Sequence, residues 1–476
     1  MTAAREKPLS SLRKRFTDAL ARLRFRHLLA AAAATQILLC LLINLSGRFN
    51  LLPNLFDANG ISSPLAFDSF YYRRKSIELV AYLARGNFSD WFNAPFPIHV
   101  KLYSLSFAVM SPLSGFTMLS VEPLNLFYYL SILILLFKLG EETFDRPTAL
   151  VATAIVALWP SFLLHTTQLL RDPLFIVVTL ALVLIVARWL TRAHSLRRGL
   201  LEALAGAACG AVVWLTRYNI WIMIVGFALL GAIFLILRQR RERRWLVGNM
   251  AGALLLLSLM GGTPAIVGVF LAPDSFISEY PMEEERLPPS PCPDDAPAPS
   301  RATQLSAAER LKAKADGAVA RLGAMRRRFA VIYQNAGSNI DACVPLWSVA
   351  DMLRYLPRGI ANGFFAPYPN MWMGTGASVG SSGRILSGVE MLAMYLIEML
   401  ALPGLWEGRK RLPVWLLALF AATGIIALGL VVINVAVMFR MRYVFWMLLI
   451  LLGAAGLRRI ISGRRQQPSG RATDYD

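Results

Sequence analysis

The chain has few of the residues on which metal, thiol and nucleotide chemistry depend. Only four histidines and four cysteines occur among its 476 residues. The histidines stand far apart and form no HExxH pattern, and no two cysteines form a CxxC pair. The phosphate-binding pattern GxxxxGK followed by Ser or Thr is also absent. These absences leave direct nucleotide hydrolysis, and chemistry built on those metal or thiol motifs, without support.

Charged residues are also sparse, at 16% of the chain, while 56% of the residues are hydrophobic and the mean hydropathy is +0.51. Apolar runs long enough to cross a bilayer recur throughout the sequence. The sequence therefore predicts an all-α, polytopic helical membrane protein. Its net charge of +20 does not indicate nucleic-acid binding, because the Lys and Arg residues lie in short clusters between apolar runs, as in cytoplasmic loops.

The basic clusters predict the topology, because each should lie on the cytoplasmic side and an even number of crossings must separate any two. The clusters are the amino terminus and residues 192–198, 238–244, 409–411 and 458–465. Parity and run length predict about ten crossings with both termini inside. The run 102–119 is short and contains Ser, Pro and Gly, so we expect an interfacial or re-entrant element there and no crossing.

Five segments follow from this topology. They are a basic cytoplasmic amino terminus (1–26), a transmembrane module (27–271) whose first outer loop spans 46–101, an outer segment (272–384), carboxyl-terminal transmembrane helices (385–457) and a basic cytoplasmic tail (458–476). No cleavable signal peptide is apparent before the first apolar run.

The outer segment differs in composition from the rest of the chain. Apolar residues within 306–332 recur at helical spacing and predict an amphipathic helix, while 355–359 and 364–369 are expected to be interfacial backbone with aromatics at headgroup depth. Cys292 and Cys343 also lie in this segment, and the sequence leaves open whether they form a disulfide.

Two aspartates and four arginines are predicted to lie on the outer face. They are Asp68, Asp172, Arg171, Arg217, Arg440 and Arg442. The last two follow Asn434 in what the sequence predicts to be one helix. A carboxylate can deprotonate an acceptor hydroxyl, and guanidinium groups bind phosphate oxygens. In the alternative interpretation the aspartates cap helices and the arginines reach the lipid headgroups.

Three motifs occur in an order that is typical of one enzyme superfamily. They are Asp68 with Tyr71, Tyr72 and a helix ending at Gly86 before Asp90-Trp91; Leu158-Trp159-Pro160 leading to the stretch 167–175 that contains Asp172; and the stretch 210–217 that ends at Arg217. In this order the chain resembles the GT-C superfamily of polyprenyl-phosphate-sugar glycosyltransferases, notably the protein mannosyltransferases and the lipid A aminoarabinose transferase. The resemblance covers roughly the first half of the chain. Ser69 stands where the family has a second acid, and 95–99 stands where it has a His-x-Pro-Pro-like element.

The resemblance implies an inverting glycosyltransferase of the bacterial inner membrane. Such an enzyme moves a sugar from a polyprenyl-phosphate lipid to an envelope glycan, lipid or protein on the periplasmic side. The implied catalytic residues are Asp68, as general base, and Asp172; the implied donor-phosphate ligands are Arg217, Arg440, Arg442 and Arg171; the implied substrate contacts are Tyr71, Tyr72 and His99. The resemblance requires no cofactor and names no metal ligand, and it leaves a divalent cation open.

Two other classes of protein remain open at this stage. A polysaccharide polymerase or ligase would also use outward arginines, to hold a lipid pyrophosphate, but needs no essential aspartate early in the chain. A lipid-glycan transporter would line a continuous central cavity with its charged residues. The response to substitution of Asp68 separates the glycosyltransferase from both.

Overall fold

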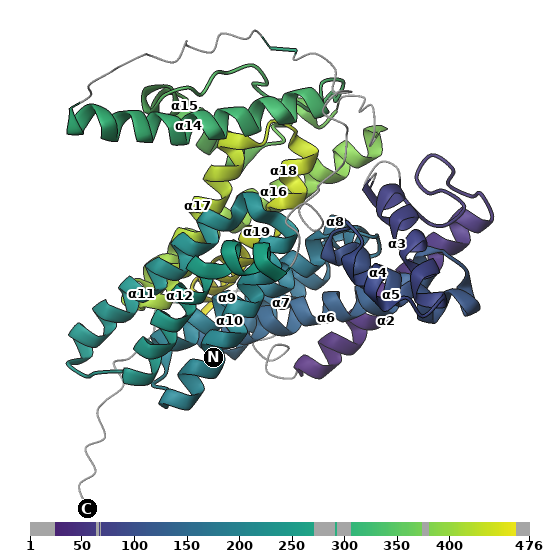
Figure 1. The fold of residues 1–476 in the computed structure, drawn as a ribbon. Helices are drawn as coiled ribbons and strands as arrows, with labels where there is room; N and C mark the ends of the chain where they lie inside the picture. The colour runs from purple at the N-terminus through teal and green to yellow at the C-terminus, as the bar shows by residue number, and fades with distance from the viewer. Residues whose placement is uncertain are drawn as a thin grey trace, which may run out of the picture.

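Figure 1 shows the computed structural model of the chain, which describes residues 24–62, 66, 68–270, 291–292, 306–373 and 380–462. Within those ranges the regular secondary structure is helical, apart from one isolated bridge between Asn339 and Asn434. The all-α prediction is confirmed. The two termini and most of 271–305 lie outside the described residues, as do the predictions made for them.

The helices agree with most of the apolar runs of the sequence. In chain order they are α2 (Phe25–Arg48), α3 (Asp68–Ala84), α4 (Phe88–Asn93), α5 (Ile98–Ser114), α6 (Met118–Thr143), α7 (Arg146–Ala157), α8 (Pro160–Thr166), α9 (Asp172–Thr191), α10 (Leu196–Arg217), α11 (Trp221–Glu242), α12 (Val247–Phe270), α14 (Ala307–Ile332), α15 (Val349–Phe365), α16 (Gly380–Gly408), α17 (Leu412–Val431), α18 (Val435–Met441) and α19 (Tyr443–Ser462). The predicted amphipathic helix of the outer segment is α14, which begins with a capping box between Ser306 and Glu309.

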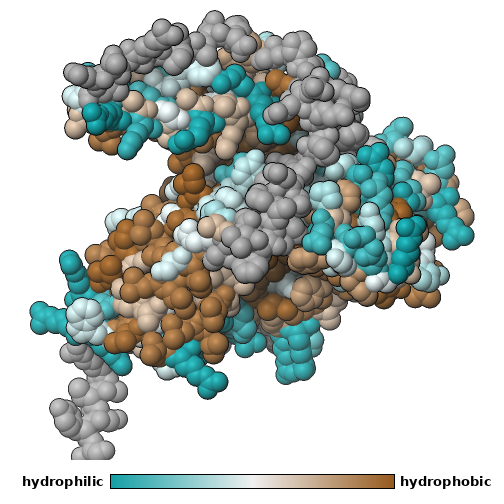
Figure 2. All heavy atoms as spheres, viewed as in Figure 1, coloured by the Kyte–Doolittle hydropathy of each residue, from teal (hydrophilic) through white to brown (hydrophobic). Residues whose placement is uncertain are grey.

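Eight helical stretches among the described residues are long and apolar enough to cross a membrane, and a ninth arises if α7 and α8 count as one bent span. These two helices meet at an angle of 68°. Pro160 explains the break, because proline at the first turn of α8 has no amide hydrogen with which to continue the helical ladder. Figure 2 shows broad apolar surface on the side of the bundle where α10, α11 and α12 lie. The chain is a polytopic helical membrane protein.

One of the eight stretches, residues 196–242, contains both α10 and α11. The two helices fold back on each other at residues 217–220, since Arg238 near the end of α11 donates a hydrogen bond to the carbonyl of Arg192, just before α10 (2.8 Å). Counting α10 and α11 as two spans, and α7 with α8 as one, gives the ten crossings expected from the basic clusters. The clusters 192–198 and 238–244 therefore share one end of the bundle, and Arg217 lies at the other.

The bundle is built around α9 and held by close helix contacts. In α9, 78% of the apolar window is buried, which explains why its sequence is apolar on all sides. A Cβ atom at Gly199 of α10 would lie 2.0 Å from the carbonyl oxygen of Gly248 in α12. Glycine at both positions lets these helices pack backbone to backbone, as small residues do in membrane bundles.

A second layer covers one end of the bundle. Figure 1 shows α3, α4 and α5 as a group beside that end, with α14 and α15 lying together across it. Most of the run 102–119 belongs to α5, which is not among the candidate spans of the described residues. This agrees with the expected interfacial element.

Two features of this layer add detail to the expectations. Much of the segment expected at the interface forms α15, which a capping box between Ser348 and Asp351 starts and which contains Pro357. Asn434 and Arg440 belong to one helix, as expected, but that helix is the short α18, which Asn434 caps, while α17 ends at residue 431.

Cys292 and Cys343 are joined by a disulfide, while Cys40 and Cys209 are free. We therefore expect an alkylating reagent to label two thiols of the denatured, unreduced protein and four after reduction, because a disulfide does not react with such reagents. Intact-mass spectrometry measures both numbers. Labelling of all four thiols without reduction would contradict the pairing.

Candidate active site

Four charged side chains meet at the end of the bundle where α10 turns into α11. The Nη2 atom of Arg440 donates a hydrogen bond to Oδ2 of Asp68 at 2.7 Å, and its Nε atom lies 3.1 Å from Oδ2 of Asp172. The other carboxylate oxygen of Asp172 accepts a hydrogen bond from Arg217. The four groups form a chain of alternating charge in the order Asp68, Arg440, Asp172, Arg217. We call them the charge chain.

The position of each charged residue at a helix end explains the sign of its charge. Asp68 and Asp172 lie in the first turns of α3 and α9, and Arg217 and Arg440 lie in the last turns of α10 and α18. A carboxylate is favoured near the positive end of a helix dipole, and a guanidinium near the negative end. Two helix starts and two helix ends therefore converge, and each supplies the charge that its own dipole favours.

Burial differs along the charge chain. Asp172 and Arg217 are each only 3% exposed, whereas the side chains of Asp68 and Arg440 are 16% and 11% exposed. Burial alone would lower the pKa of Arg440, but the carboxylates of Asp172 and Asp68 raise it above its usual value, so the guanidinium stays charged. A ligand from outside would therefore meet Asp68 and Arg440 before the deeper pair.

His99 and Tyr72 lie beside the charge chain. The His99 ring is 2% exposed and packs edge-on against the ring of Tyr72, with 4.5 Å between ring centroids. Neither ring nitrogen of His99 has a hydrogen-bond partner among the described residues. Burial, helped by the positive charge of Arg171, lowers the pKa of His99 to about 3. The imidazole is therefore neutral and offers an unused donor and an unused acceptor.

The lowered pKa of His99 predicts a dependence of stability on pH. Between about pH 6.5, where an unfolded histidine titrates, and the folded pKa of about 3, the unfolded chain binds a proton that the folded chain does not. Stability should therefore fall as pH falls through that window. We expect His99→Gln to weaken the pH dependence of the unfolding midpoint between pH 7 and pH 5. An unchanged slope in the variant would contradict a neutral, buried imidazole.

Two of the predicted residues have contacts outside the charge chain. Arg442 is fully buried, and its guanidinium donates hydrogen bonds to the backbone carbonyls of Gly363 (2.6 Å) and Ala366 (2.5 Å) at the end of α15. Its donors are thus directed at the protein backbone and not at the charge chain. The ring of Tyr71 is half-buried and lies under the guanidinium of Arg74 at 5.9 Å, next to Tyr72 on α3.

A second buried polar network lies where α8, α16 and α19 meet. Glu390 accepts hydrogen bonds from the amide (2.7 Å) and the hydroxyl (2.5 Å) of Ser161, and Tyr443 donates to the same hydroxyl (2.8 Å). The Nδ1 atom of His165 lies 3.0 Å from the Tyr443 hydroxyl. These contacts hold α8 in its bent position against α16. Sequence reasoning missed the network because its members lie up to 282 residues apart.

The described residues contain no group of three or more His, Cys, Asp or Glu side chains that could hold a metal ion. No protein-family model, curated protein or solved structure matches the chain. The functional assignment therefore rests on the residues of the charge chain and their surroundings.

Proposed function

We propose that the protein is a membrane glycosyltransferase that moves a sugar from a polyprenyl-phosphate lipid to an acceptor of the cell envelope. The observation that supports this most is the contact of Arg440 with both Asp68 and Asp172. A base and a phosphate-binding cation must lie within a few ångströms of each other for such a transfer, because the acceptor attacks the carbon that carries the leaving phosphate.

The reaction assigned to this site is a single displacement. The acceptor oxygen forms a bond to the anomeric carbon, the bond from that carbon to the phosphate oxygen breaks, and its electrons leave with the phosphate. Asp68 takes the proton from the acceptor hydroxyl. Arg440 binds the phosphate and neutralises its charge, with Arg217 behind it, and so releases Asp68 from its ion pair. Attack opposite the leaving phosphate inverts the anomeric centre.

The surroundings of the site suit a lipid donor. Exposed apolar side chains cover the neighbouring helices α4 and α5, including Phe88, Phe92, Val109 and Leu113, of which Leu113 is 81% exposed. Such a surface is stable when it lies against lipid tails or headgroups. The isoprenoid chain of the donor would remain in the bilayer while its phosphate reaches Arg440.

The basic clusters give the proposed orientation. Residues 192–198 and 238–244 lie at the end of the bundle opposite Arg217, and basic loops favour the cytoplasmic side. The charge chain then faces the periplasm of a bacterial inner membrane, with both termini in the cytoplasm. The Cys292–Cys343 disulfide supports this orientation, because disulfides persist in oxidising compartments.

The test compares lipid-linked sugars and envelope glycans, by mass spectrometry, from cells with the intact gene, a deletion, and the deletion restored with the intact gene. We expect the deletion to lose one sugar from the envelope and to accumulate that sugar on polyprenyl monophosphate. Accumulation of an oligosaccharide on polyprenyl pyrophosphate would favour a polymerase instead. Unchanged lipids and glycans would overturn the proposal.

A further inference from the structure

Arg440 lies on a helix that is too short to hold itself in place. α18 has seven residues, and helices of that length are not stable without tertiary contacts. The residue that starts it, Asn434, is 3% exposed and uses both ends of its amide. Its Oδ1 atom accepts a hydrogen bond from the amide of Val437 (3.1 Å) and so caps α18.

The other end of the same amide reaches a different part of the chain. The Nδ2 atom of Asn434 donates hydrogen bonds to Oγ of Ser338 (3.2 Å) and to Oδ1 of Asn339 (3.0 Å). Two backbone bonds run alongside: the amide of Ile340 donates to the carbonyl of Ile433 (2.9 Å), and the amide of Val435 donates to the carbonyl of Ser338 (3.1 Å). Residues 338–340 thus pair with 433–435, and we call this pairing the brace.

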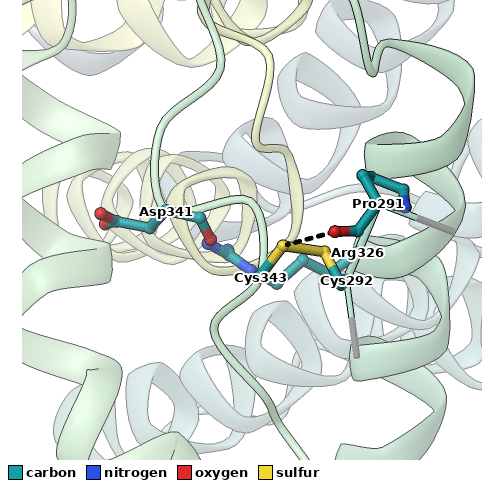
Figure 3. The surroundings of a disulfide bond; sticks show 5 residues. All are labelled: Pro291, Cys292, Arg326, Asp341 and Cys343. Atoms are coloured by element: carbon teal, nitrogen blue, oxygen red, sulfur yellow. Dashed lines mark hydrogen bonds between the residues drawn. A yellow bond between two sulfur atoms is a disulfide. The ribbon is translucent and has the colours of Figure 1, made fainter. Parts of the chain in front are cut away.

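A disulfide and an arginine side chain lie next to the brace and hold its two segments. Cys343 forms the disulfide with Cys292, which is 7% exposed and packs in one cluster with Ile433, the residue before Asn434. Figure 3 shows the guanidinium of Arg326 beside this disulfide, extended toward the backbone of Asp341. Arg326 of α14 donates to the carbonyls of Asp341 (2.5 Å), the residue after the brace segment 338–340, and of Leu430 (2.7 Å), near the end of α17.

We propose that Asn434 is a positioning residue for Arg440: by joining the brace to the start of α18, it holds the Arg440 guanidinium between Asp68 and Asp172. The role depends on the proposed function in that Arg440 is the phosphate ligand. Arg440 lies six positions after Asn434, and the single short helix α18 connects them. Movement of its first residue would move Arg440 out of reach of one carboxylate.

The test uses a substitution that keeps the cap of α18 and removes the hydrogen-bond donor to Ser338 and Asn339. In Asn434→Ser the hydroxyl can still cap α18, while the donor to Ser338 and Asn339 is lost. We expect kcat/KM for sugar transfer to fall by about 10- to 100-fold with only a small decrease of the thermal midpoint, because a displacement of about 1 Å at a catalytic group has effects of that size on the rate. In an Arg440→Lys background the same substitution should cause no further loss, since it acts through Arg440.

A second readout does not depend on sugar transfer. Phenylglyoxal modifies accessible arginines, and peptide mass spectrometry gives the rate at each position. We expect Arg440 to react faster in Asn434→Ser, and also in the double variant Cys292→Ser with Cys343→Ser, while Arg442 keeps its rate as an internal reference. An unchanged Arg440 rate, or equal kcat/KM losses with and without Arg440→Lys, would overturn the positioning role.

The two readouts distinguish the failure of each proposal. If the intact protein transfers no sugar but Asn434→Ser exposes Arg440, the proposed function is wrong and the brace still positions the arginine. If Arg440→Lys abolishes transfer while Asn434→Ser leaves both kcat/KM and the Arg440 modification rate unchanged, the proposed function stands and the positioning role is wrong.

Discussion

We expect the replacement of Asp68 by asparagine to lower the rate of the proposed sugar transfer by about 10²- to 10⁴-fold, the range that a positioned general base contributes. Asparagine keeps the shape of the side chain and can still accept a hydrogen bond from Arg440, but it cannot take a proton from the acceptor. The measurement is the initial rate of transfer by purified protein, with the polyprenyl-phosphate sugar that accumulates in the deletion strain as donor.

The matched control is Asp90→Asn, which removes another carboxylate of the same outer loop. Asp90 is exposed, lies on α4 and is paired with Asn87 within that helix. We expect this variant to retain the activity of the intact protein. If Asp68→Asn also retained full activity, Asp68 would be a structural residue that neutralises Arg440, and the mechanism proposed here would be wrong.

Replacing Asp172 by alanine destabilises the protein by about 3 to 5 kcal/mol, the usual cost of removing one partner from a buried ion pair. The loss is large because Asp172 is the carboxylate between two arginines, Arg217 and Arg440, and it is only 3% exposed. Without it, Arg217 and Arg440 lose the carboxylate that they share, while Arg217 stays buried. The measurement is the free energy of unfolding in detergent, obtained from chemical denaturation.

A surface ion pair supplies the control for Asp172→Ala. Glu141 pairs with Lys138 at 3.0 Å on α6, and the Lys138 side chain is half exposed. Glu141→Ala should change the free energy of unfolding by less than about 1 kcal/mol, because exposed pairs contribute little. A similar, small change for both variants would mean that water reaches the charge chain and screens it.

The transmembrane helices could be predicted because hydropathy reports on the solvent around each segment. A long run of apolar residues crosses the bilayer whatever helices pack beside it. Basic clusters indicate which of the connecting loops face the cytoplasm. α15 was missed for the opposite reason. Pro357 and the aromatics around it are typical of irregular backbone, and the helix forms there because residues such as Tyr355 and Gly359 pack against the end of α17.

The candidate site could also be predicted only in part. The aspartates and arginines could be selected one by one, because arginines expected away from the cytoplasmic clusters go against the usual bias of arginine toward cytoplasmic loops. Their contacts could not be predicted, since Asp68 and Arg440 are 372 residues apart. Arg442 shows the difference most clearly. It lies two residues after Arg440 but beyond the end of α18, so its side chain leaves in another direction and binds the carbonyls of α15.

The sequence by itself determined that this protein is a helical bundle in a membrane, where its basic clusters lie along the chain and which polar residues are candidates for a site. Those properties depend on composition and local order along the chain. Only the tertiary structure decided that Arg440 joins Asp68 to Asp172, that Arg442 does not, and that Asn434 caps α18 while it contacts Ser338. Such choices depend on distances of a few ångströms between segments far apart in the chain, and packing of the whole bundle sets those distances.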